Sequence, residues 1–419
     1  MLCGTGAHGA YHAGVLRALQ EAGVKVDVMA GQGVGAASAA LAAIDGASRL
    51  WDTDGVWKGS AVRAFYRWKW PLRTAGWLLV LLVAAVAVPV LAAGLGLAVD
   101  ALPWATAALA AIAAALLALV AGSALMERRA PSRRTVAGGF WWRVLGAPLE
   151  ADVAYAVFAD ALAQLIRGAG QAARPSRAAL GRRYAEVLAE SLGQPGFREL
   201  LIVVTDLDSR RDIVGGLLRD PYRHEFVAPR PGGERKSETV DLTAGGRDQA
   251  FDLIAAALTP PVVCDPYPVT FGVDSYWRGE THRLCDRVGG CSRLLEELAA
   301  AGVSQAIVVS AVAAPPAPHR LTSPRLEPRH RLGEFLAAAE SAALRDALEL
   351  ARLRFDSVYL ISPAHNPVGA FDLAGAYDEA SDRRQELAEL MDRAYEDAYR
   401  QFIEPVVGAS GEHLAHVAP

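Results

Sequence analysis

The sequence lacks the features of a nucleic-acid-binding or disulfide-rich protein. Its 419 residues carry 42 lysines and arginines against 46 aspartates and glutamates, a formal net charge of −4. A nucleic-acid-binding domain usually needs a strongly basic face, so we predict no nucleic-acid partner. Cysteine is scarce, and the spacing of the four residues fits no disulfide scaffold, so a cytosolic domain would keep them reduced: Cys3, Cys264, Cys285 and Cys291.

Candidate metal ligands are also few. His282, Cys285 and Cys291 lie near one another in the sequence, but their spacing matches no usual zinc pattern. A fourth ligand is not apparent. We therefore predict neither a metal nor a cofactor.

Charge is missing altogether from two long stretches. No charged residue lies between Arg73 and Asp100 or between Asp100 and Glu127, and apolar residues make up 52% of the chain. Within these stretches, residues 77–99 and 102–126 each have about the length of roughly 20 residues that crosses a bilayer core as a helix. We predict a two-helix transmembrane hairpin over residues 71–129, and the alternative is a pair of buried core helices.

Basic residues flank this hairpin on both sides. Arg67, Lys69 and Arg73 precede it, and four arginines follow it: Arg128, Arg129, Arg133 and Arg134. The positive-inside rule then places both ends in the cytoplasm. Residues 1–3 run directly into a glycine-rich loop without the regions of a signal peptide. We expect an integral protein of the inner or cytoplasmic membrane, with the bilayer as a partner and the remaining chain on the cytoplasmic side.

Strand and helix patterns alternate at the start of the chain. Residues 1–3 end a strand, a glycine loop follows, and a helix runs to Gly23. A strand over residues 24–30, a second glycine turn and a helix over residues 36–44 come next. Such alternation predicts an α/β fold with a mostly parallel sheet covered by helices. Because strands average about five or six residues, the short first strand predicts an extension upstream of Met1.

The same pattern resumes after the hairpin. Residues 200–204 form a continuous apolar run, as in a central parallel strand. Further strands are predicted at residues 306–309 and 357–361, helical segments at 151–191 and 379–403, and a surface loop at 313–331.

Two glycine-rich turns carry the chemical information. Ester hydrolysis by a serine needs a nucleophile on a strained strand-to-helix turn, a partner that takes its proton, and N–H groups for the oxyanion. Residues 31–35 have the glycine placement of the nucleophile elbow G-x-S-x-G, with Gly31 and Gly35 around a central Gly33. The first turn offers backbone N–H groups at a helix N-terminus: Gly4, Thr5, Gly6, Ala7, His8 and Gly9. Either turn alone could instead bind a phosphate or simply connect two elements.

The order and spacing of these turns resemble the opening of the patatin-like phospholipase family. Between them lies a helix that ends V-L-R-A-L-Q-E-A-G. Downstream, residues 201–208 (L-I-V-V-T-D-L-D) resemble the family's central strand, and residues 255–261 (A-A-A-L-T-P-P) resemble the segment before its catalytic aspartate. Asp286 stands where the family's aspartate-glycine motif should be.

This resemblance implies a patatin-like three-layer α/β/α fold with a mostly parallel central sheet. It implies that the glycine loop forms the oxyanion hole, and that the elbow residue and Asp286 form the Ser-Asp dyad of a lipid acyl hydrolase. The substrate would be a membrane lipid or acyl ester. The patatin-like domain would comprise residues 1–70 and 130–312, the hairpin residues 71–129, and a loop with a C-terminal helical extension residues 313–419.

Three departures from the family pattern bear on activity. Gly33 has no side chain and cannot form an acyl-enzyme. His8 replaces the usual arginine or lysine and would be only partly charged near neutral pH, which weakens support for the oxyanion. Arg287 and Val288 replace the glycines that follow the aspartate, although Gly289 and Gly290 come next.

No substitute nucleophile is evident. Ser38 lies about 140° around its helix from Gly33, since each helical residue turns the chain by about 100°. Ser292 and Ser310 lack a glycine elbow, and we interpret His12 as a surface or interface histidine.

Three hypotheses remain open. The chain is a catalytically impaired module that binds lipid or a partner, an active hydrolase with a non-standard mechanism such as a water activated by Asp286, or a phosphate-binding protein. For the last, no acidic ribose partner follows at the expected distance, and Asp45 is the nearest.

Overall fold

A computed structural model describes residues 1–95, 102–127, 146–166, 175–228, 237–273, 275–312, 328–364, 368–378 and 383–408. The chain divides into two compact units. The larger unit contains Met1–Tyr66, Ala151–Pro261 and Pro266–Pro419, and the smaller contains Arg67–Glu150 and Val262–Asp265. Both charge-free stretches of the sequence therefore belong to the smaller unit.

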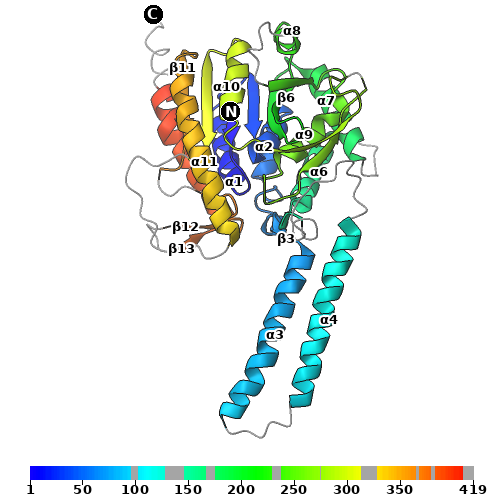
Figure 1. The fold of residues 1–419 in the computed structure, drawn as a ribbon. Coiled ribbons are helices and arrows are strands. Elements are labelled where there is room, and N and C mark those ends of the chain that lie inside the picture. The colour runs from blue at the N-terminus through cyan, green and yellow to red at the C-terminus, as the bar shows by residue number, and fades with distance from the viewer. Residues whose placement is uncertain are drawn as a thin grey trace, which may run out of the picture. The chain divides into compact units, whose positions relative to one another are not determined.

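A nine-stranded sheet forms the centre of the larger unit (Figure 1). Its order is β11-β10-β1-β2-β5-β6-β7, and β9 pairs with β5 and then with β8. The strands are β1 (Leu2–Cys3), β2 (Val28–Gln32), β5 (Glu199–Asp206), β6 (Arg211–Leu217), β7 (Ser237–Asp241), β8 (Tyr267–Thr270), β9 (Thr281–Asp286), β10 (Gln305–Ser310) and β11 (Ser357–Ile361). Strands β11 to β5 pair in parallel, as do β6 and β7. The sheet is thus mostly parallel, as predicted, but β5 pairs antiparallel with both β6 and β9.

Helices cover both faces of this sheet (Figure 1). On one face, α2 (Val34–Ala43) and α9 (Ala250–Ala257) contact β2 and β5, and α1 (His8–Glu21) packs beside α2. On the other face, apolar side chains of α10 (Cys291–Ala300) and α11 (Pro328–Ala351) meet Ala30, Leu201 and Val203. Successive strand residues point to opposite faces, so Ala30 faces the second group of helices while Gly31 lies against Ala36 of α2. The larger unit is an α/β domain.

Strand boundaries follow the pairing partners rather than the local pattern alone. Strand β2 begins at Val28, because its ladder with β5 starts at the pair Val28 and Glu199 and continues to Gln32. The expectation of a strand over residues 24–30 was therefore wrong at both ends. The predicted strands at 200–204 and 306–309 lie within β5 and β10, and the strand at 357–361 is confirmed as β11.

The C-terminal part of the chain completes the larger unit. Helix α12 (Leu387–Ala398) packs along α1, and a π-helical segment, Tyr399–Gly408, follows it. The predicted surface loop was wrong at residues 328–331, which begin α11 with Pro328 in the first turn, where proline is tolerated. The predicted helix from residue 379 was also wrong at its start. Residues Arg383–Gln385 instead form β13, which pairs antiparallel with β12 (Ala376–Asp378).

Three further helices, α6, α7 and α8, belong to this domain. The predicted helical segment 151–191 forms α6 (Asp152–Ile166) and α7 (Arg177–Ser191), which contact each other. Helix α7 also packs against α9 and the short helix Arg247–Gln249. Helix α8 (Tyr222–Val227) packs against β6, β7 and α10.

The smaller unit consists mainly of two helices that pack along each other, α3 (Trp70–Gly94) and α4 (Leu102–Glu127). Short strands β3 (Arg67–Trp68) and β4 (Leu149–Glu150) pair antiparallel where the chain enters and leaves the unit. Helix α3 contains an apolar stretch, Trp70–Leu91, long enough to cross a membrane, for which ~20 residues are required. The apolar stretch that is fully described within α4 is Thr106–Gly122. One of the two predicted spans thus meets the length criterion among the described residues. Residues 96–101 and 128–134, with the arginines of the predicted basic flank, lie outside the description, as do residues 313–327.

Candidate functional site

The turn between β2 and α2 has the backbone of a nucleophile elbow. Gly33 adopts φ 59° and ψ −133°, a conformation that side-chain-bearing residues rarely occupy. A Cβ on Gly31 would lie 2.4 Å from the Ala36 Cα, and one on Gly35 would lie 2.2 Å from the Leu2 carbonyl oxygen. Both flanking glycines are therefore required by close backbone approach. The elbow is built as for a nucleophile, and its central residue has no side chain.

Asp286 lies beside this elbow. It ends β9, where it pairs with Val204 of the central strand, and its N–H donates to the Thr259 carbonyl oxygen at 2.8 Å. Its Oδ2 is 3.0 Å from the position that a Cβ on Gly33 would take. The structure thus brings together two positions that are 253 residues apart in the chain, Gly33 and Asp286.

Burial raises the pKa of Asp286 to about 7. The Thr5 hydroxyl, the neighbouring N–H groups of Arg287 and Gly33, and the charge of Arg287 act in the opposite direction but do not outweigh burial. The side chain is 2% exposed. Such a carboxyl can accept or release a proton near neutral pH, which is the property required of a general base.

The hydroxyl partner of Asp286 is a residue that sequence analysis did not place there. Thr5 Oγ1 donates a hydrogen bond of 2.7 Å to Asp286 Oδ2. Thr5 comes from the glycine-rich loop, where we expected it to contribute only a backbone N–H. Nothing in the local sequence indicates this pair, because the two residues meet only when β1 and β9 take their places in the sheet.

The glycine-rich loop is also hydrogen-bonded within the protein. The N–H of Thr5 donates to His8 Nδ1 at 2.9 Å, and the N–H of Ala7 donates to the Ala370 carbonyl oxygen at 2.8 Å. The Val34 N–H, next to the elbow, donates to the Gly4 carbonyl oxygen at 2.8 Å. A Cβ on Gly6 would lie 2.0 Å from the same Ala370 oxygen. These three N–H groups already have acceptors, so none of them is free to hold an oxyanion.

Two histidines behind the loop are buried and uncharged at neutral pH. Burial lowers the pKa of His8 to about 4, and the Val368 carbonyl oxygen at 2.8 Å from Nε2 offsets this only in part. The expectation that His8 would be partly charged near neutral pH was therefore wrong, because it assumed an exposed ring. His12 is fully buried as well, not at a surface, and burial lowers its pKa to about 3. Its Nε2 lies 3.0 Å from the Cys3 carbonyl oxygen.

A second buried carboxyl lies near Asp286. Glu340 of α11 is 1% exposed, and its pKa is raised well above the usual range by burial and by the charges of Asp286 and Cys291. Glu340 Oε1 and Asp286 Oδ1 are both buried without a hydrogen-bond partner among the described residues. Sequence analysis missed Glu340, because an acidic residue in a charged amphipathic helix gives no sign of burial.

Two tyrosine hydroxyls form hydrogen bonds to the segment that accepts the Asp286 N–H. Tyr155 of α6 bonds to the Thr259 hydroxyl at 2.6 Å, and Thr259 is the residue whose carbonyl receives the Asp286 N–H. The Tyr66 hydroxyl donates to the Leu258 carbonyl oxygen at 2.9 Å. Its ring lies 3.5 Å from the Cβ position of Gly6 and stacks edge-on against Phe371.

The other candidate residues lie elsewhere. Ser38 is fully buried in α2, and Ser310 is buried at the end of β10, where its Oγ accepts the Val312 N–H. His282 lies 2.5 Å from Asp206, and all four cysteines are free and buried. Among the described residues, no group of three or more histidine, cysteine, aspartate or glutamate side chains is placed to hold a metal.

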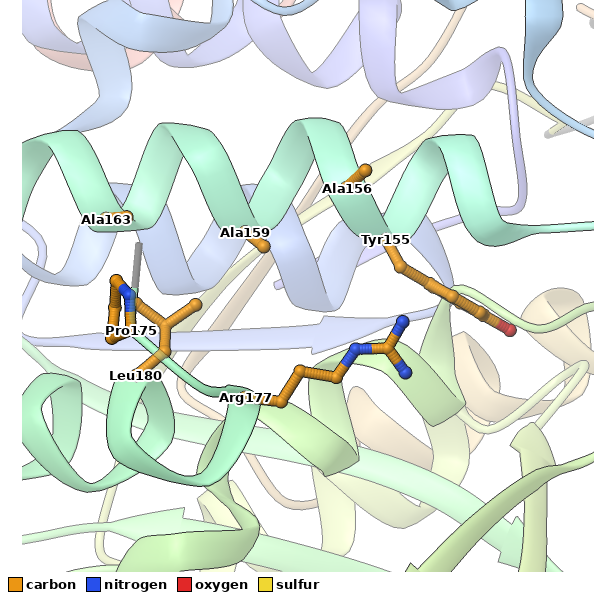
Figure 2. Close-up of a pocket in the computed structure, with 7 residues that line it drawn as sticks. All are labelled: Tyr155, Ala156, Ala159, Ala163, Pro175, Arg177 and Leu180. Atoms are coloured by element: carbon orange, nitrogen blue, oxygen red, sulfur yellow. The ribbon is translucent and has the colours of Figure 1, made fainter. Parts of the chain in front are cut away.

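A pocket of about 270 Å³ opens between α6 and α7 (Figure 2). Ala156, Ala159 and Ala163 leave space along α6, and Leu180 of α7 lines the same space. At one end, the Arg177 guanidinium lies 5.8 Å from the Tyr155 ring centre and donates to the Tyr267 hydroxyl at 3.1 Å. Tyr155 lines this pocket and also bonds to Thr259, whose carbonyl oxygen accepts the Asp286 N–H. The elbow does not line the pocket.

Comparison with known proteins agrees with the site geometry. The model of the family described as patatin-like phospholipase matches residues 1–326, which include the glycine-rich loop, the elbow and Asp286. No curated protein matches the chain. Because the family match covers more than three quarters of the 419 residues, the chain belongs to the patatin-like phospholipase family.

Proposed function

We propose that this protein is a membrane-anchored relative of the lipid acyl hydrolases whose own site cannot carry out the covalent step. The observation that carries the proposal is the elbow, where Gly33 has the backbone conformation of a nucleophile. A Cβ at this position would lie 3.0 Å from Oδ2 of the buried Asp286. In a Ser-Asp dyad the serine oxygen attacks the ester carbonyl while the aspartate takes its proton. Gly33 has no oxygen to contribute, so no acyl-enzyme forms at the elbow.

The ligand class that suits such a protein is a membrane lipid or another acyl ester. The family acts on lipid esters, and the larger unit retains the α/β frame that positions the elbow. A protein of this kind would bind lipid or an acyl chain, or a protein partner, without turning it over. This makes it a pseudoenzyme at the membrane surface.

The direct test is ester hydrolysis by the purified protein. With short and long p-nitrophenyl esters and with phospholipid, we expect rates equal to those of the Asp286→Asn variant, because no covalent route is available. A rate in the unmodified protein that Asp286→Asn abolishes would overturn the proposed impairment.

We propose further that α3 and α4 anchor the protein in the inner or cytoplasmic membrane, with the larger unit in the cytoplasm. Large apolar side chains of α3 are more than half exposed, including Trp77, Leu81 and Val83. Exposed apolar surface of this extent marks contact with a membrane or a partner. The basic residues on both sides of the hairpin support the cytoplasmic orientation.

Alkaline carbonate extraction tests this anchoring. We expect the protein to remain with the membranes, and Val83→Arg to release a fraction of it, because a charge at a helix centre costs about 2.5–3.5 kcal/mol on insertion. Leu353→Arg is the matched control, since Leu353 is 83% exposed in the larger unit and should not alter extraction. Release of the unmodified protein would refute the membrane hairpin.

A second candidate function is an active hydrolase that uses Thr5. The 2.7 Å bond from Thr5 Oγ1 to Asp286 Oδ2 favours it, because this is the hydroxyl–carboxyl pair that an acyl transfer needs. The Thr5 oxygen would bond to the acyl carbon, its proton would pass to Asp286 and then to the leaving alcohol, and water would release the acid. Activity that Thr5→Val abolishes and Thr5→Ser retains would select this candidate.

A further inference from the structure

One peptide group, between Gly4 and Thr5, occupies the place that a nucleophile side chain would take. The Gly4 carbonyl oxygen lies 2.3 Å from the Cβ position of Gly33 and accepts the Val34 N–H at 2.8 Å. A side chain at position 33 would overlap this oxygen. The absence of a serine is therefore matched by a backbone carbonyl that fills the space.

The other end of the same peptide points away from the elbow. In a trans peptide the C=O and the N–H point in opposite directions. The carbonyl faces the elbow, so the Thr5 N–H faces the opposite way, where it donates to His8 Nδ1 at 2.9 Å. An oxyanion would instead need an N–H that faces the elbow. Neither polar group of the Gly4–Thr5 peptide is thus oriented for catalysis, because the C=O faces the elbow and the N–H faces away from it.

His8 is the acceptor that fixes this orientation. Its Nε2 lies 2.8 Å from the Val368 carbonyl oxygen, which can only accept, so Nε2 carries the proton and Nδ1 has the free lone pair. The ring is completely buried, which keeps it neutral. A lysine or arginine at this position would have donors only and could not accept the Thr5 N–H.

We propose that His8 is a positioning residue that holds the Gly4–Thr5 peptide with its C=O, and not its N–H, facing the elbow. The site is then closed by its own backbone and also lacks a nucleophile. Turning the peptide back removes the carbonyl from the elbow and presents the Thr5 N–H to it. Gly4, at φ 146°, supplies the backbone freedom for this rotation. This inference rests on the proposed loss of the covalent step and adds that a serine alone does not restore it.

The test reintroduces the serine and then releases the peptide. In Gly33→Ser, an alkyl fluorophosphonate would form a P–O bond to the new serine, lose fluoride, and leave the serine proton on Asp286. We expect slow labelling in this variant. Adding His8→Met, which has similar bulk and no nitrogen acceptor, should speed labelling by about tenfold, the equilibrium factor of one buried hydrogen bond.

Two control variants isolate the acceptor. His8→Asn places an amide oxygen near the former Nδ1, so Gly33→Ser with His8→Asn should label as slowly as Gly33→Ser alone. His12→Met makes the same substitution at the neighbouring buried histidine, which does not accept the Thr5 N–H, and should also leave labelling slow. Gly33→Ser that labels as fast alone as with His8→Met would overturn the inference, while the proposed function would still stand.

A second measurement does not depend on activity or on any variant at Gly33. Nitrogen NMR of the imidazole rings in the unmodified protein should show His8 at neutral pH as the Nε2–H tautomer, with Nδ1 unprotonated. The His8 signals are identified by their absence from His8→Asn. A protonated Nδ1 would contradict the proposal, because it could not accept the Thr5 N–H.

Discussion

The two halves of the site differ in how their backbone is held. The elbow and aspartate half keeps its backbone, with Gly33 at φ 59° and ψ −133° and Asp286 next to its Cβ position. The glycine-loop half differs, because its N–H groups at Thr5 and Ala7 are taken by His8 and Ala370. The elbow is held by the sheet and by α2, whereas the loop is held by its hydrogen bonds to His8 and Ala370.

This difference teaches that the backbone of the elbow does not need a side chain at its centre. A Cβ on Gly31 or Gly35 would lie 2.2–2.4 Å from Leu2 or Ala36, so close backbone packing holds the turn on both sides of its centre. The loop is closely packed as well, since a Cβ on Gly6 would lie 2.0 Å from the Ala370 carbonyl oxygen. With glycine at the centre of the elbow, the Gly4 carbonyl oxygen lies beside it and accepts the Val34 N–H.

The largest expected effect comes from restoring a side chain at the elbow. Gly33→Ser should lower the free energy of unfolding by about 2–5 kcal/mol, since it adds backbone strain and overlap with the Gly4 carbonyl. Gly23→Ser is the matched control, because Gly23 has φ 69° with open space around it and should cost about 1 kcal/mol. Thermal unfolding in detergent measures both, and equal losses would show that the elbow space is not filled.

An intermediate effect is expected from Thr5, which joins the two halves. Thr5→Val removes the hydrogen bond to Asp286 and should cost about 1.5–3 kcal/mol above pH 7, where the carboxyl is charged. Below pH 7 the cost should be smaller. Thr270→Val, which removes the exposed bond to the Thr281 hydroxyl, is the control and should have little effect. No difference between the two variants would mean that Thr5 does not bind the aspartate.

The smallest effect, per pH unit, is expected from the titration of Asp286. Folding raises the pKa of this carboxyl to about 7 from an ordinary value near 4, so the folded state keeps a proton that the unfolded state gives up. Stability contributed by this group is therefore lost as pH rises from about 4 to about 7, by up to about 1.4 kcal/mol per unit. The difference in free energy of unfolding between Asp286→Asn and the unmodified protein should rise in favour of the variant across this window and stay constant above it. A pH-independent difference would argue against a buried carboxyl.

Much of the fold could be predicted because its elements are marked locally. Strand β11 and the core of β5 are apolar runs, and Gly23, at φ 69°, ends α1 as its position indicates. The long helix α11 was not predicted at all, and the proline-rich sequence before it indicated a loop that extends into its first turn. Strand β13 was missed because Arg383–Gln385 carries a charged, helix-like pattern and becomes a strand only by pairing with β12.

Only those parts of the site that are continuous in the sequence could be predicted. The elbow and the glycine loop are contiguous motifs and were found as such. The bond from Thr5 to Asp286 spans 281 residues, and the bond between His8 and the Val368 carbonyl oxygen spans 360. Such contacts arise from the order of strands in the sheet, which no local pattern encodes.

The most direct test of the central claim is the intact mass of the unmodified protein after treatment with an alkyl fluorophosphonate. Because the central residue of the elbow, Gly33, has no side-chain oxygen, the account predicts that the mass does not change under conditions that label an active serine hydrolase fully. A stoichiometric adduct that disappears in Asp286→Asn would contradict it.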